Sequence, residues 1–265
     1  MLTMKNDTQR AADQVVRTLL RLGAQPPKEV QAAMNDAEAA RSRLAEARAG
    51  VEPHQLGALL DTVAAGGELD GDTLARLTLV AVAPDPATWR SAEARAEAGI
   101  THAVREHAGE VIEAVRPVFD GAAGHLTEAH RMLGDIDLDD LHAVTAKGGD
   151  AAAHWQAATK AETTLLLVLT LVQNLATAGA YPEGDRRERL LVLADMPLEN
   201  YKRTAAGMRP WDVLRVAGSL DLADADEFTR RVGVIRDEWS RDPDNVRTRI
   251  PERVGQFAAT FGQVQ

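Results

Sequence analysis

The chain has 265 residues, of which 45% are hydrophobic, 26% charged and only 4% aromatic, and its net charge is −10. It contains no cysteine, which excludes disulfides, thiol nucleophiles and cysteine-bound metals. The acidic charge disfavours extensive wrapping of nucleic acid, and the few aromatic rings offer little stacking surface for bases.

Helix-forming residues dominate throughout, and no alternating apolar–polar run is long enough to predict a strand, so we expect an all-α protein. The first helix should begin at Asp7, a good N-cap residue, and end at Leu22 before Gly23. The second helix, at about 28–50, carries a seam of small apolar residues at heptad-like spacing. This seam predicts that the first two helices pack closely as a helical hairpin over residues 7–50. The seam consists of Ala33, Ala37, Ala40, Leu44, Ala47 and Val51.

Two shorter helices are expected at 53–64 and 72–82. A long helix should begin near Pro86, because proline is favoured in a first turn, and continue to residue 133. Pro117, with Gly121 and Gly124 nearby, is expected to kink or divide it. The acidic turn that follows, GDIDLDD, is typical of residues that precede a helix.

The most apolar stretch of the chain is KAETTLLLVLTLVQNLATAGAY, residues 160–181. Its uncharged window of 18 residues contains several threonines and two amides, whereas a membrane span needs about 20 apolar residues. We therefore expect the helix at about 150–178 to be the central, buried helix of a bundle, with the wall of a ligand pocket as an alternative. Gln173 and Asn174 should be its only buried polar pair, and a charge at Leu166 or Leu169 should unfold the bundle.

The remaining residues are predicted to form a compact module of short helices, near 185–195, 197–206, 210–220, 223–240 and 251–262. The complete prediction is an elongated multi-helix bundle over residues 1–181, followed by a C-terminal helical module over 182–265. The two parts differ in charge: the first carries 16 basic and 25 acidic residues, and the second carries 14 and 15.

The sequence shows no catalytic or cofactor-binding motif, and no metal site is expected. Two pairs of histidines, His102/His107 and His125/His130, are five residues apart, which places the members of each pair on different helix faces. No cofactor is therefore predicted.

One enzymatic alternative uses two acidic pairs, Glu110 with Glu113 and Asp137 with Asp140. If adjacent helices carried these pairs, they could hold Mg²⁺ against the phosphates of a nucleotide. All-α nucleotide pyrophosphohydrolases use acidic pairs of this kind, so a Mg²⁺-dependent hydrolase is one alternative function.

The C-terminal module supplies the other candidates. A helix–turn–helix arrangement near its start could contact DNA, so a DNA-associated regulator is the second alternative. We favour a non-enzymatic structural, assembly or adaptor protein that acts through protein partners or self-association in the cytoplasm. The composition favours a phage or mobile element of a GC-rich bacterium. The residues proposed for an interface with protein or DNA are Tyr201, Lys202, Arg203, Arg209, Trp211, Arg215 and Trp239.

Overall fold

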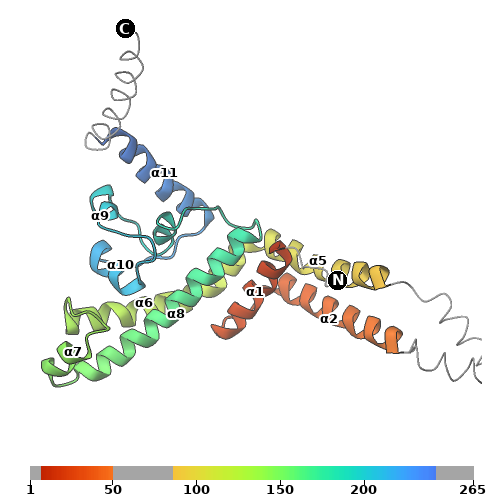
Figure 1. Ribbon diagram of the computed structural model, residues 1–265, viewed down its shortest axis with the longest axis horizontal. Helices are drawn as coiled ribbons and strands as arrows, with labels where there is room; N and C mark the ends of the chain where they lie inside the picture. The colour runs from red at the N-terminus through yellow and green to blue at the C-terminus, as the bar shows by residue number, and fades with distance from the viewer. Residues whose placement is uncertain (1–6, 50–85, 243–265) are drawn as a thin grey trace, which may run out of the picture.

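The computed structural model describes residues 7–49 and 86–242, and within these ranges the chain is helical with no strand (Figure 1). This confirms the predicted fold class. The helices expected at 53–64, 72–82 and 251–262 lie outside the described residues.

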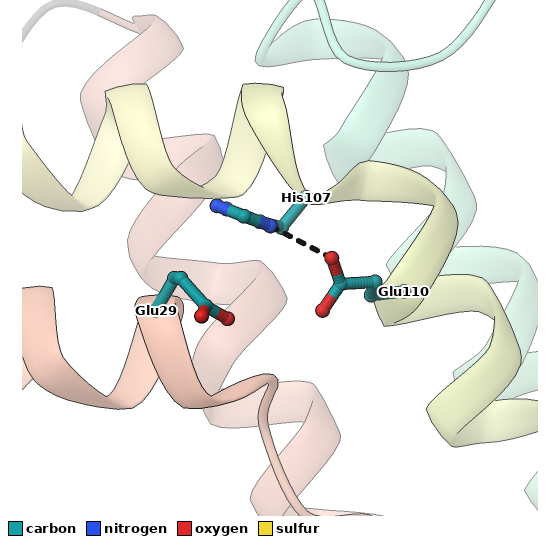
Figure 2. Close-up of side chains that lie close together, drawn as sticks. All are labelled: Glu29, His107 and Glu110. Atoms are coloured by element: carbon teal, nitrogen blue, oxygen red, sulfur yellow. Dashed lines mark hydrogen bonds and ion pairs between the residues drawn. The ribbon is translucent and has the colours of Figure 1, made fainter.

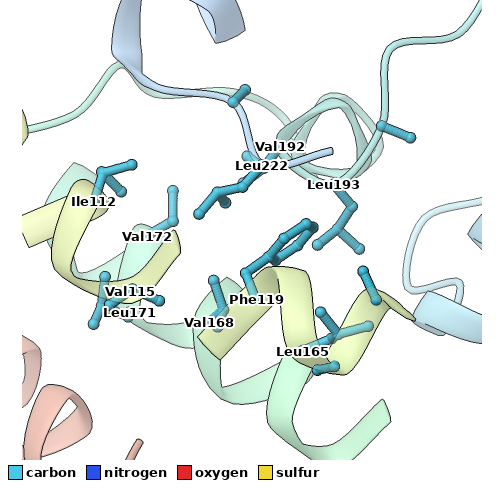
Figure 3. Packing of buried hydrophobic residues seen from close by; sticks show 14 of the residues in the cluster. Ile112, Val115, Phe119, Leu165, Val168, Leu171, Val172, Val192, Leu193 and Leu222 are labelled. Carbon is cyan, nitrogen blue, oxygen red and sulfur yellow. The ribbon is translucent and has the colours of Figure 1, made fainter. Parts of the chain in front are cut away.

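Two long helices form the spine of the molecule, α6 (Ala108–Leu133) and α8 (Ala151–Thr177), which lie side by side (Figure 1). Figure 3 shows their interface, where Phe119 of α6 packs near Leu165 and Val168 of α8. All three side chains are fully buried. Burial of each such side chain contributes about 1.5–3 kcal/mol, so this interface is a large part of the folding free energy.

The predicted central apolar helix is confirmed as α8, but it is not buried on every side. Leu166 is 42% exposed, Gln173 is exposed and Asn174 is half-buried. The expectation that Gln173 and Asn174 form a buried pair is therefore wrong. A charged side chain at Leu166 would be exposed to solvent rather than buried in the core. The buried polar residue of α8 is Glu162, which is 3% exposed.

Glu162 is buried because three donors satisfy its carboxylate. Arg209 donates from Nε at 3.0 Å and also from Nη2, and the backbone N–H of Trp211 donates at 3.3 Å. A buried carboxylate is tolerated only with such partners. Local sequence patterns cannot reveal this pairing, since Arg209 is 47 residues away from Glu162.

At one end of the spine lie α1 (Asp7–Arg21), α2 (Lys28–Ala49) and α5 (Pro86–Glu106). The strongly amphipathic α1 packs on α8 and α5, burying Ala12, Val15 and Leu19. The alanine-rich α2 packs along α5 (Figure 1). The close partner expected for the α2 seam is thus α5 rather than α1, because the larger apolar face of α1 is buried against α8.

The long helix expected over 86–133 is divided, but at His107 rather than at Pro117. His107 has φ −109° and ψ 25°, outside the helical range, and it separates α5 from α6. Pro117 lies inside α6, which continues through it and through Gly121 and Gly124. A proline removes one N–H donor from a helix, and the packed α6–α8 interface tolerates that loss here.

The acidic turn after α6 begins a short helix, α7 (Leu141–Lys147), that the sequence did not predict. Asp140 is its N-cap residue, and its side chain accepts a hydrogen bond from the N–H of Ala143 at 2.9 Å. Trp155 of α8 donates from Nε1 to the carbonyl of Leu138 at 2.7 Å and ties the turn to the spine.

The C-terminal region consists of a short 3₁₀ helix, η1 (Glu188–Val192), and the helices α9 (Leu198–Lys202), α10 (Pro210–Ala217) and α11 (Ala225–Arg241). Its buried residues join the same core cluster as those of the spine. The division of the chain near residue 181 into two folding units stays a prediction.

Arg231 of α11, only 1% exposed, holds this region together. Its Nη1 donates to the carbonyls of Leu191 at 3.1 Å and Asp221 at 3.0 Å, and its Nε donates to the carboxylate of Glu227 at 2.8 Å. One side chain therefore links η1, α11 and the segment between α10 and α11.

Among the described residues, no helix combines the length and apolarity needed to cross a bilayer.

Replacing Arg231 with Met should destabilise the protein by about 3–5 kcal/mol, because the carbonyls of Leu191 and Asp221 lose a donor and the carboxylates of Asp221 and Glu227 each lose an ion pair with a buried guanidinium. Urea unfolding followed by circular dichroism measures the change. Arg230→Met is the matched control: Arg230 is half exposed and pairs at the surface with Glu227 and Asp195, so its loss should change the free energy of unfolding far less than the loss of Arg231. Equal losses in the two variants would contradict the role assigned to Arg231.

Replacing Glu162 with Gln should lower the free energy of unfolding by about 2–3 kcal/mol, because the charge-assisted bonds to Arg209 are weakened in a buried site. Thr163→Ala, at the next and exposed position, should change it by less than about 0.5 kcal/mol. Thermal and urea unfolding of both variants would measure the difference, and a Gln variant as stable as wild type would show that the buried pair is dispensable.

Candidate functional site

An open groove runs along the uncovered side of α8 and has a volume of about 640 Å³. One wall is α8, with Leu166, Leu169 and Thr170 at one end and Ala176 and Thr177 at the other. The opposite wall comes from the segment after α8, from η1, from the α9–α10 turn and from the start of α11. Its residues are Tyr181, Pro182, Glu183, Gly184, Arg186, Arg189, Leu190, Val192, Gly207, Met208 and Phe228.

From residue 163 to its end, α8 exposes Thr163, Leu166, Thr170, Gln173 and Thr177, which we call the α8 stripe. The spacing alternates between three and four residues, so these side chains form one line along the helix. Each threonine hydroxyl of the stripe donates to the carbonyl four residues earlier, at 2.8–3.0 Å. Because their donors are used internally, the threonine hydroxyls offer a partner only acceptor positions, and no residue of the stripe carries a charge.

The charged side chains around the groove are mostly basic. Arg186 and Arg189 are exposed on the wall opposite α8, and Lys160 is exposed one turn before the stripe. Glu183 is the one acidic residue among those that line the groove. Within the described part of the chain, none of these four side chains has a hydrogen-bond or ion-pair partner. The groove is thus locally basic on a chain of net charge −10.

The aromatic residues predicted for an interface lie in or against the core. Trp211 is 2% exposed and donates from Nε1 to the carbonyl of Ile136 at 3.1 Å. Tyr201 is also buried, with the Arg187 guanidinium 4.4 Å from its ring centre, and desolvation raises the pKa of Tyr201 to about 12. Trp239 packs edge-on against Tyr201, with 6.3 Å between ring centres. These rings stabilise the C-terminal region.

The predicted basic residues are mostly neutralised within the chain. Lys202 pairs with Asp242 at 2.7 Å and with Glu199 at 3.3 Å. Besides Glu162, Arg209 contacts the carboxylate of Asp139 at 2.7 Å.

Arg215 contacts Asp135 and Asp212, each at 3.5 Å. Of the four basic candidates, only Arg203 is exposed with no partner among the described residues. A continuous basic surface for a phosphate backbone is not formed by this set.

The two acidic pairs of the hydrolase alternative lie at opposite ends of α6. Glu110 and Glu113 are in its first turns, whereas Asp137 and Asp140 follow its last residue. At 1.5 Å per residue, the helix between Glu113 and its last residue is about 30 Å long. The structure therefore does not bring the two pairs together around one Mg²⁺ ion.

Another cluster joins residues that are distant in sequence: Glu29 of α2, His107 and Glu110 (Figure 2). One ligand atom of each lies within 4.8 Å of the others, the one such group of three among the described residues. His107 Nδ1 and Glu110 Oε1 are 2.9 Å apart. Imidazole and carboxylate groups can bind divalent transition metals. Intrahelical spacing could not reveal this group, because it spans two helices and a helix junction.

Helix ends explain this cluster without an ion. Glu29 lies in the first turn of α2 and Glu110 in the first turn of α6, where a negative charge is stabilised by the helix dipole. The same positive helix ends disfavour a cation. The hydrogen bond with Glu110 raises the pKa of His107 above 6.5, and the charges of Glu110, Glu29 and Glu106 act in the same direction. The cluster is a proton-dependent contact between α2 and α6.

Comparison of the chain with protein-family models, with curated proteins and with solved structures gave no match.

Because the folded pKa of His107 is raised, its protonation should stabilise the fold fully below about pH 6.5. This contribution is lost as the pH rises through the folded pKa. His107→Gln should thus lower the melting temperature more at about pH 5.5 than at about pH 8.5. His142→Gln, at an exposed position of α7, serves as the comparison for the loss of an imidazole elsewhere on the surface. An NMR titration that placed the pKa of His107 below 6.5 would contradict this assignment.

Proposed function

We propose that this protein is a non-enzymatic assembly or adaptor protein that binds another protein through the α8 groove. The observation that carries this proposal is the exposed α8 stripe. Surface helices normally carry charged residues on their solvent face, whereas residues 163–180 of α8 and its C-terminal extension contain none. An exposed, uncharged surface that includes an apolar side chain such as Leu166 and is bordered by charged side chains is typical of protein interaction sites.

The side chains of the groove support binding rather than catalysis. Its ionisable lining residues are Tyr181, Glu183, Arg186 and Arg189. The Tyr181 hydroxyl donates to the backbone carbonyls of Ala223 and Asp224, at 3.1 Å each, and burial raises its pKa. A positioned acid–base pair, which hydrolytic chemistry requires, is not present among these four.

The two alternative functions have less support. Ion pairs within the chain use most of the basic residues that a DNA regulator would need, and the length of α6 separates the acidic pairs of a hydrolase. We also propose a cytoplasmic location, supported by the lack of cysteine. Origin from a phage or mobile element of a GC-rich bacterium remains a proposal supported by composition alone.

Affinity capture with the tagged full chain tests the proposed function. Wild type should retain a defined protein partner from native lysate, and Leu166→Glu should retain less than about a tenth of it, because a charge in an apolar contact costs more than about 1.4 kcal/mol. Leu141→Glu, at a residue 54% exposed on α7, is the matched control and should bind like wild type. Circular dichroism should show that all three proteins are folded.

A chain that stays monomeric in light scattering and retains no protein would contradict the assembly or adaptor role. If the Leu166→Glu variant retained the partner as well as wild type does, the adaptor role would stand, but the contact would lie outside the α8 groove.

A further inference from the structure

We infer that the occupant of the α8 groove is an acidic amphipathic helix of the partner protein. This inference rests on the proposed function, which it deepens by specifying the chemistry of the partner.

The shape of the apolar surface fits a helix. The α8 stripe follows the three–four spacing along which a second helix packs. Leu166 and Leu169 on α8 face a wall that includes Leu190, Met208 and Phe228. An amphipathic helix in such a groove inserts apolar side chains at positions i, i+3 or i+4, and i+7. Because the groove is open along one side, it can admit a helix with its polar face in solvent.

The charges around the groove indicate which charges the polar face of that helix should carry. Arg186 and Arg189 line the wall opposite α8, against the single carboxylate of Glu183, and Lys160 is exposed on α8 one turn before the stripe. Elsewhere in the C-terminal region, arginines such as Arg231 and Arg236 pair with carboxylates of the chain. Unpaired guanidinium groups beside an apolar groove favour glutamate or aspartate flanking the apolar stripe of the partner. Such rim charges contribute more to specificity and association rate than to affinity.

A second copy of the chain fits this surface less well. In a two-fold symmetric dimer the same patch meets itself, so two locally basic surfaces would be brought together. Like charges at an interface are unfavourable. A small anionic ligand is also disfavoured, because the basic groups of the groove are exposed at its rim and not buried within it.

Binding of two designed peptides to the full chain tests the inference. The probe is a fluorescein-labelled helical peptide of about 18 residues with a leucine stripe flanked by glutamates; its matched partner carries lysines in place of the glutamates. Fluorescence polarisation should show at least about tenfold tighter binding of the acidic peptide, with a preference that decreases as salt rises. Leu166→Glu should weaken the acidic peptide at least about tenfold.

The double variant Arg186→Ser, Arg189→Ser should remove most of the preference for the acidic peptide while leaving binding of the basic peptide unchanged or stronger. Arg203→Ser and Leu141→Glu, both at exposed positions outside the groove, are the controls and should bind like wild type.

Three outcomes would overturn the inference: equal binding of the two peptides or no binding, no effect of Leu166→Glu, or a dimer of the full chain in light scattering that Leu166→Glu abolishes. The last would assign the groove to a second copy. Each of these outcomes can occur while the full chain still captures a protein partner from lysate through Leu166, or while it still self-assembles. The failure of the inference is thus distinguishable from failure of the proposed function.

Discussion

The buried carboxylate of Glu162 is the constraint on which the arrangement of the spine and the C-terminal region depends. A charged group at 3% exposure must be paired, and its donors, Arg209 and the N–H of Trp211, lie at the start of α10. This fixes the N-terminus of α10 on α8. The Trp211 ring then enters the core, 5.4 Å from the ring of His130. One ionic contact in an apolar helix therefore determines where the C-terminal region sits on the spine.

The groove follows from a second attachment at the other end of α8. There, Arg105 donates to the carbonyl of Ala178 at 2.6 Å, and Tyr181 donates to the carbonyl of Ala223. The C-terminal region is thus held near Glu162 and again near Tyr181, and between these points the α8 stripe is left uncovered. The stripe is exposed because the C-terminal region is attached to α8 at these two points, whereas the apolar residues on the other faces of α8 are packed against α1 and α6.

The sequence predicted the long helices well because their apolar spacing and their glycine and proline boundaries are local signals. It failed where the structure depends on a distant partner. From sequence alone Glu162 is expected at the surface, because its partner Arg209 is distant in the chain. The prediction that Gln173 and Asn174 are buried rested only on the leucines around them. Pro117 is the strongest local signal for a break, yet the chain breaks at His107, where α2 and α6 meet.

The candidate site shows the same limit at the level of single side chains. Tyr201 and Trp211 were natural choices for an interface, but in a chain with 4% aromatic residues the few large rings are needed to fill the core. The stripe was present in the sequence as Thr163, Thr170 and Thr177, residues that count as polar. Their hydroxyls are bonded within α8, so they have no free donor to offer a partner. The proposed docking surface therefore extends along α8 beyond Leu166, over residues that count as polar in the sequence.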